Sequence, residues 1–244
     1  MKKIIVHTTW MVKELLRQPA YLVSTIAFPS LFYLIFAVPE SKDEGGANLL
    51  LGSFTSFAVF GVIFLQLGVG IAQERSQSWY LYLRTLPLRG ITFLGARFLS
   101  AFFYSILAAG AVIVLALLLT PVHLTTEKWV LFILTLGFGG ASFSCMGLAL
   151  GYWAGEKSCL PLGNLIYLPL TFAGGLWKPP EVLPDFIQDI SIYLPTRHFG
   201  ELVWASLLDR AMDWKYVALL VGNFLFFGVV TYLGYRRDQV QRFS

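Results

Sequence analysis

The chain alternates between long apolar runs and short polar connections. Six runs carry no Asp, Glu, Lys or Arg over at least 20 residues, and these are residues 18–39, 45–73, 98–126, 129–155, 158–177 and 216–235. About 20 apolar residues in a helix match the ~30 Å hydrocarbon core of a bilayer. Lipid offers the backbone no hydrogen-bond partner, so each run is predicted to be helical. We therefore expect six transmembrane helices, at about 20–38, 50–72, 97–119, 129–153, 160–177 and 215–235.

Composition and charge add the class of protein and its orientation. Hydrophobic residues make up 57% of the chain and charged residues 13%, whereas a soluble domain has about 25% charged residues. When the connections are assigned alternately to two sides, one side carries 12 basic and four acidic residues, and the other carries six basic and ten acidic residues. The positive-inside rule predicts that the basic side, with both termini, is cytosolic. The net charge of +4 then indicates contact with anionic headgroups, not nucleic acid.

The segment before the first span has an amphipathic pattern. Ile5, Val12 and Leu16 recur at helical spacing, and Lys13 and Arg17 take other positions. A basic amphipathic helix suits the cytosolic interface of the membrane. A soluble helical tail is the alternative, and we favour the interfacial helix because the segment joins the first span directly.

The longest cytosolic connection, residues 73–95, contains a second amphipathic segment. Apolar side chains fall on one helical face, and these are Trp79, Tyr82, Leu83 and Leu86. Pro87 and Gly90 are expected to end this helix, which we place at about 76–86. Composition leaves two roles open, because such a helix suits either the lipid headgroups or a cleft in another protein.

The fifth apolar run is interrupted by helix-breaking residues, which are Pro161, Gly163, Pro169, Gly174 and Gly175. A broken span of this kind typically faces protein or a cavity. After it, Pro184 and Asp185 can start one short helix, and Thr196 can cap another after a bend at Pro195. We predict a re-entrant helix pair at about 181–208 on the outer side, with a surface helix pair as the alternative.

Several kinds of chemistry are missing from the sequence. No phosphate-binding loop of the G-x-x-x-x-G-K-[ST] type is present, and His7, His123 and His198 are too scattered for a metal site. The stretch 137–147, GFGGASFSCMG, is typical of close helix packing rather than of a nucleophile. The spans lack the buried charges of ion-coupled transporters. If the protein moves a substrate, its energy is expected to come from a partner.

Two segments resemble the permeases of type-2 ABC exporters, and together with the six spans the resemblance covers essentially the whole chain. The first is residues 72–98, AQERSQSWYLYLRTLPLRGITFLGARF, where the match is carried by Glu74, Arg75, Leu83, Pro87, Gly95 and Arg97. The second is residues 170–205, LTFAGGLWKPPEVLPDFIQDISIYLPTRHFGELVWA, where it is carried by Gly174, Gly175, Pro179, Leu183, Pro184, Pro195 and Glu201. The chain departs from the family at Gln77–Ser78, where Gly-Thr is usual, and at Leu194, where Asn often precedes the proline.

The resemblance implies an all-α transport subunit, with 1–244 as one transmembrane domain, in the plasma (inner) membrane of a prokaryote. Two such permeases would pair, and each would dock to a cytosolic ATPase that holds ATP and Mg, so that this chain binds no cofactor or metal and has no catalytic residue. The residues implied in ATPase coupling are Glu74, Arg75, Trp79, Tyr82, Leu83, Arg84, Leu86 and Pro87. The residues implied in an outer gate are Gly174, Gly175, Pro179, Pro184, Pro195 and Glu201. The second and fifth spans would line the path.

Two questions of function stay open at this point. The apolar, aromatic path favours an amphipathic, lipid-like or drug-like substrate, although Trp177, Tyr193 and Trp204 could also serve as platforms for a carbohydrate. Those aromatics also fit an interfacial belt. The alternative to a transporter is a structural or sensory membrane protein that binds a non-ATPase partner through residues 76–86.

Overall fold

The computed structural model describes residues 2–77, 90–208 and 210–241, and every regular element among them is helical. The α-helices are α1 (Lys2–Leu16), α2 (Pro19–Leu22), α3 (Phe28–Phe32), α4 (Glu44–Ser76), α6 (Gly90–Leu119), α7 (Thr126–Trp153), α8 (Glu156–Ala173), α9 (Asp185–Ser191), α10 (Pro195–Leu207) and α11 (Trp214–Gln241). Short π-helical segments are Val23–Ala27 and Tyr33–Ala37, and 3-10 turns are Val38–Glu40 and Pro180–Val182. Most of the predicted coupling helix, including Trp79 to Pro87, lies outside the described residues.

Five segments among the described residues are long and apolar enough to cross a membrane. They are Pro19–Glu40, Glu44–Ser76, Thr92–Leu119, Thr126–Trp153 and Trp214–Gln239, and they coincide with five of the six predicted spans. The sixth prediction falls on α8, which has 18 residues, begins with Glu156 and Lys157, and contains Pro161 and Pro169. At 1.5 Å per residue α8 is about 27 Å long. The sixth crossing therefore stays a prediction.

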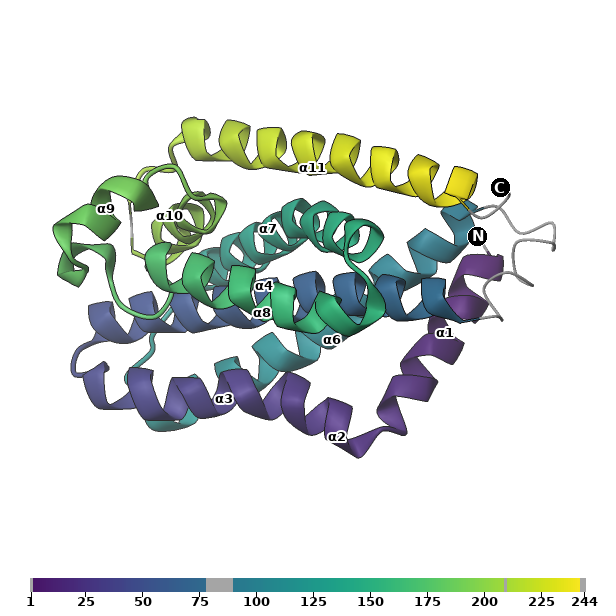
Figure 1. Cartoon of the computed structure of the whole chain (residues 1–244). Helices are drawn as coiled ribbons and strands as arrows, with labels where there is room; N and C mark the ends of the chain where they lie inside the picture. The colour runs from purple at the N-terminus through teal and green to yellow at the C-terminus, as the bar shows by residue number, and fades with distance from the viewer. Residues whose placement is uncertain (1, 78–89, 209, 242–244) are drawn as a thin grey trace.

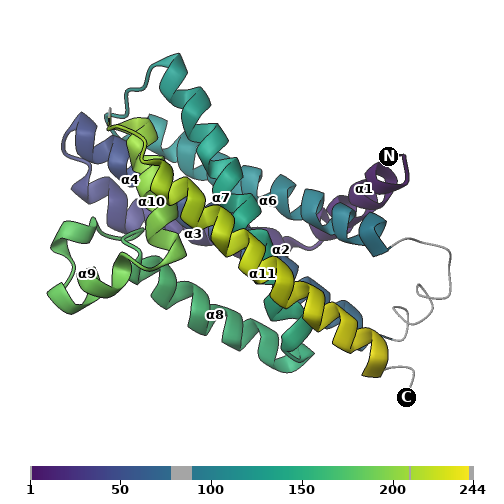
Figure 2. The same cartoon turned by 90° about the horizontal axis from the view of Figure 1, so that it is seen from above.

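Helix α4 is the centre of the bundle. In its most apolar stretch 83% of the residues are buried, and α6, α7, α8 and α10 all pack against it (Figure 2). Helix α11 packs on α7 and α10 at the outside of the bundle, and only 11% of its apolar stretch is buried. A central helix in contact with several others is well placed to pass a movement on to them.

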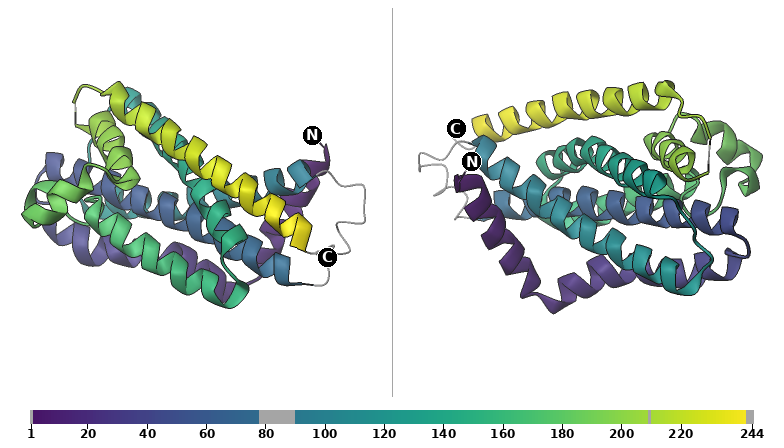
Figure 3. Two further views of the ribbon diagram at one scale, coloured as in Figure 1. Left: turned by 45° about the horizontal axis from the view of Figure 1, so that its top comes forward. Right: turned by 180° about the vertical axis from the view of Figure 1, so that it is seen from behind.

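Both chain termini lie at one end of the molecule, and α9 lies at the opposite end (Figures 1 and 3). Helix α8 runs beside α4 from the end with the termini toward the end with α9. We call these the terminal end and the α9 end. The described helices thus traverse the length of the molecule in alternating directions, and α8 supplies one of these passes.

The first membrane segment is not a regular α-helix. The π-helical segment Val23–Ala27 precedes α3, whose second residue is Pro29. Proline lacks the N–H that would bond back to the previous turn, and wider π turns accommodate such local breaks. The predicted helix over 20–38 is present but wound unevenly.

The polar turn after this segment is short. The second span was predicted at 50–72, but α4 already begins at Glu44. The Asp43 side chain accepts a hydrogen bond from Gly46 N at 3.1 Å, which caps the helix and satisfies one of its free N–H groups. The cap extends the predicted span 50–72 by two turns into the polar segment.

Close packing between α4 and α7 depends on glycine. A Cβ atom on Gly147 would lie 2.6 Å from the Phe64 carbonyl oxygen, and one on Gly151 would lie 2.6 Å from the Gly68 carbonyl oxygen. The two backbones therefore approach each other more closely than any side chain would allow. This confirms that the stretch 137–147 belongs to a packing surface, as its small residues predicted.

Candidate coupling and gate sites

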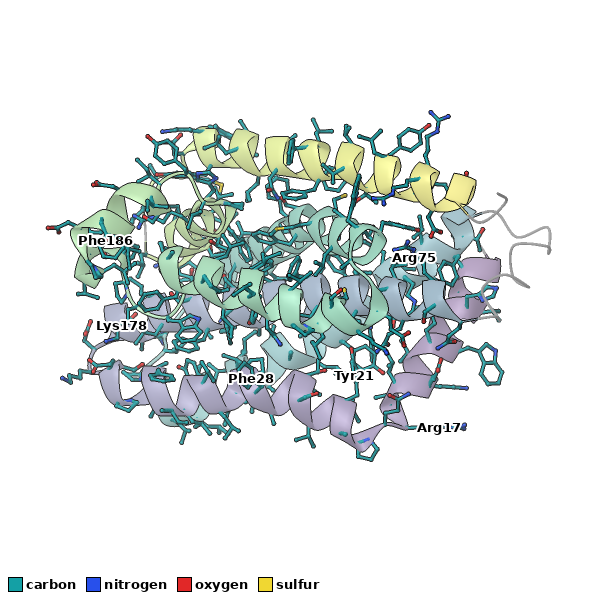
Figure 4. All side chains as sticks on the ribbon, viewed as in Figure 1. Arg17, Tyr21, Phe28, Arg75, Lys178 and Phe186 are labelled. Atoms are coloured by element: carbon teal, nitrogen blue, oxygen red, sulfur yellow. The ribbon has the colours of Figure 1, made fainter. Side chains whose placement is uncertain are left out.

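Arg75, in the last turn of α4, anchors that helix at the terminal end (Figure 4). Its Nε donates to Asp238 Oδ1 of α11 at 2.8 Å, and its Nη1 donates to the Gly151 and Tyr152 carbonyl oxygens of α7, each at 2.8 Å. Asp238 is only 2% exposed. Charge-assisted bonds are about twice as strong as neutral ones. Arg75 therefore joins the ends of α4, α7 and α11.

Glu74, the preceding residue, makes a second anchor on the other side of α4. Its carboxylate forms an ion pair with Arg97 of α6, and both side chains are largely buried. A Cβ on Gly70, one turn earlier, would lie 2.9 Å from Arg97 Nη1. Glycine at this position leaves room for the guanidinium group between the helices.

The two anchors stand directly before the predicted coupling segment. Glu74 and Arg75 were expected from the resemblance to contact an ATPase, and the structure shows them in contacts within the chain. Trp79, Tyr82, Leu83, Arg84, Leu86 and Pro87 lie outside the described residues, so their expected contacts stay a prediction. What the geometry adds is a tight connection between the start of this segment and helices α6, α7 and α11.

The turn after α8 is built from the predicted gate glycines. Gly174 is the C-cap of α8, and a Cβ there would lie 2.3 Å from Thr196 Oγ1. Gly175 has φ +82°, and its Cβ would lie 2.7 Å from Pro180 Cγ. A positive φ favours glycine because other residues clash there. These glycines let the chain reverse tightly and bring α10 against the end of α8.

The predicted helix pair is present, with one correction. Helix α9 begins at Asp185 after Pro184 and α10 begins at Pro195, as the prolines predicted. The prediction that Thr196 caps α10 is wrong, because Thr196 lies inside the helix and its Oγ1 donates to the Leu170 carbonyl oxygen at 2.6 Å. Pro195 is suited to the first helical position, because its missing N–H would have no partner within the helix there.

Trp204, which the sequence suggested as a surface aromatic, holds α10 in the bundle. Trp204 is 2% exposed, and its Nε1 donates to Ser53 Oγ of α4 at 2.8 Å. It is therefore neither an interfacial belt residue nor a platform for a carbohydrate. Gly52 makes room beside it, because a Cβ there would lie 2.7 Å from Leu207 Cδ1.

Three polar side chains of α10 have partners nearby. Glu201 forms an ion pair with Arg197 one turn earlier, with Nε–Oε1 and Nη2–Oε1 distances of 2.7 and 2.6 Å. His198 Nε2 donates to the Ile192 carbonyl oxygen at 2.9 Å, and its ring stacks on Tyr216 of α11. Burial lowers the pKa of His198 below its ordinary value, and the nearby Lys215 and Arg197 act in the same direction. His198 is therefore neutral in the folded protein near pH 7.

An aromatic cluster connects the first membrane segment to the turn after α8. Trp177 packs against Phe32, Phe36, Phe57 and Phe172, and its Nε1 donates to Thr171 Oγ1 at 3.1 Å. Phe36 is 45% exposed, so one edge of the cluster reaches the surface of the chain. The cluster offers an apolar, aromatic surface next to the turn after α8.

These features define a class of protein, a multi-pass helical membrane protein. The chain belongs to the ABC-2 type transporter family, whose pattern matches residues 3–208. It is also similar to a Bacillus subtilis (strain 168) protein named "Putative transport permease YvfS", with 27% identity over 221 residues, or 88% of this chain and 89% of that protein. The family resemblance found in the sequence is thereby confirmed, and it supports the role of a transport permease subunit.

Proposed function

We propose that this chain is the permease of an ATP-driven exporter that works with a separate cytosolic ATPase. The observation that carries the proposal is the pair of anchors, Glu74 and Arg75, at the end of α4 where the predicted coupling segment begins. ATP and Mg would bind to the partner, and this chain would bind no cofactor. Membership of the ABC-2 type transporter family supports the same arrangement.

The proposed topology has six crossings with both termini in the cytosol. Five helices have the length and apolarity of spans, and α8 would be the sixth. The supporting observation is that both termini lie at one end of the molecule, which requires an even number of passes. The excess of basic residues on that side assigns it to the cytosol of a prokaryotic plasma (inner) membrane.

In the proposed cycle, closure of the ATPase dimer moves residues 76–86, and α4 carries the movement. Because Arg75 bonds to α7 and α11 and Glu74 pairs with α6, these helices would move with α4. The re-entrant pair α9 and α10 would respond at the far end, since α10 packs directly on α4. This is a two-state change driven by a partner's differential affinity for the two states.

The proposed substrate is amphipathic, lipid-like or drug-like, and leaves the cytosol by alternating access. The aromatic cluster around Trp177 supports an apolar path beside α4 and α8. A carbohydrate is less well supported, because Trp204 is buried inside the bundle. A second copy of the chain, or a related permease, would complete the path.

The test is co-purification of the chain with its cognate ATPase after a change in the coupling segment. Trp79→Asp or Leu83→Asp should abolish ATPase binding, because a carboxylate would replace an apolar contact. Tyr193→Asp is the matched control, since Tyr193 comes directly after α9 and its C-cap Ile192, is 77% exposed and should leave binding intact.

Two results would count against this function. One is co-purification that survives both coupling-segment substitutions, and the other is the absence of any bound ATPase. Recovery of a non-ATPase protein that is lost with Trp79→Asp would favour the structural or sensory alternative.

A further inference from the structure

A small polar pocket lies at the terminal end. It has a volume of about 230 Å³ and is lined by the end of α7, the connection to α8 and the last turns of α11. The residues that matter here are Arg75, Trp153, Gly155, Arg237 and Asp238. The pocket is partly open to the surroundings of the chain, because Trp153 is 51% exposed.

The two arginines of this pocket have different surroundings. Arg75 is compensated by Asp238 and by two carbonyl oxygens of α7. Arg237 is exposed, and its guanidinium lies 5.3 Å from the centre of the Trp153 ring. Within the described part of the chain, Arg237 pairs with no carboxylate. The lining thus has a net positive charge that is concentrated on Arg237.

The surroundings of the pocket are those of a membrane interface. Trp153 is an amphipathic ring at the end of a span, where tryptophan is enriched at the level of the headgroups, and its Nε1 donates to the Val230 carbonyl oxygen at 3.1 Å. Leu160, five residues after the lining residue Gly155, and Leu233, directly before the lining residue Gly234, are 49% and 53% exposed. A molecule with an anionic head and apolar chains matches a positively charged pocket with exposed apolar side chains on α8 and α11.

We propose that the pocket binds the phosphate of an anionic phospholipid from the cytosolic leaflet, with Arg237 as its principal charged contact. The assignment to the cytosolic leaflet rests on the proposed orientation of the permease. Basic pockets between membrane helices on this side are suited to phospholipid headgroups. The acyl chains would lie along Leu160 and Leu233. A bound lipid would bridge α7, α8 and α11 beside the Arg75 anchor.

The experiment uses the purified full chain in mixed micelles of phosphatidylcholine into which phosphatidylglycerol is titrated. The readout is the midpoint of thermal unfolding. Arg237→Gln should raise the phosphatidylglycerol concentration for half-maximal stabilisation about fivefold, the value expected for one basic side chain near an anionic surface. Arg237→Lys should retain most of the effect. Arg236→Gln is the matched control, because Arg236 does not line the pocket and carries the same charge.

Each outcome decides the proposal. A fivefold shift with Arg237→Gln alone supports it. Equal shifts with Arg236→Gln and Arg237→Gln, or no preference for phosphatidylglycerol over phosphatidylcholine, would overturn it. Sodium phosphate added to phosphatidylcholine micelles distinguishes the sources, and stabilisation by phosphate alone would overturn the lipid assignment. None of these measurements involves ATPase binding, so a negative result leaves the proposed function standing, and loss of ATPase binding leaves this result standing.

Discussion

The turn after α8 offers the sharpest test of the structure, through Gly175→Ala. A residue with a Cβ at φ +82° occupies the left-handed region, which costs about 1–2 kcal/mol. The new Cβ would also lie 2.7 Å from Pro180 Cγ, and a proline ring cannot rotate away. Overpacking of this kind typically costs about 1–3 kcal/mol. Together they predict a loss of about 2–5 kcal/mol in the free energy of unfolding.

The matched control is Gly137→Ala in α7, where no atom lies within 4 Å of the added Cβ. Alanine favours a helix interior over glycine by about 0.5–1 kcal/mol, so this variant should unfold at the wild-type temperature or above. The assay is thermal unfolding of the purified chain in detergent, followed by size-exclusion chromatography after heating. If Gly175→Ala melts at the wild-type temperature, the turn after α8 does not need glycine at this position.

Three further changes test single contacts by the same assay. Ser53→Ala should cost about 1–3 kcal/mol, because it leaves the buried Trp204 N–H without an acceptor; an unchanged midpoint would contradict that bond. Asp238→Asn should cost about 1 kcal/mol, since Asn can still accept from Arg75 but without the negative charge, and a double-mutant cycle with Arg75→Met should show coupling of at least about 0.5 kcal/mol. Because burial lowers the pKa of His198, the unfolded chain takes up a proton first, so stability should fall as the pH drops below about 6.5. His198→Gln should flatten that dependence, and an unaltered pH profile would assign it to other groups.

Length and apolarity predicted the five spanning helices because a backbone in lipid has few alternatives to a helix. Charge-free runs predicted where they end less well. The charge-free run led us to place the second span at 50–72, but the Asp43 side chain caps α4, and the helix begins at Glu44. Likewise α8 begins at Glu156, before the charge-free run, because an acidic residue is favourable in the first turn of a helix.

The contacts at the terminal end could not be predicted from the sequence. Glu74 and Arg75 were identified as important, but their partners are distant, with Asp238 163 positions from Arg75. No local pattern pairs residues over such separations. The same holds for Trp204, which meets Ser53 across 151 positions. A helix within 181–208 was predicted, but its sequence could not say that α10 packs on α4.

The central place of α4 has a consequence for how the chain is made. Helix α4 leaves the ribosome second among the membrane segments, yet α10, which covers its Gly52 and Ser53, ends 131 residues later, at Leu207 against Ser76. At about 5–20 residues per second, that interval is about 7–26 s. During this time the face of α4 that later packs on α10 would be exposed to lipid. The Thr55 hydroxyl suits both states, because it bonds to the Leu51 carbonyl oxygen of its own helix at 2.6 Å, whereas Ser53 acquires its tryptophan partner only after residue 204 has been made.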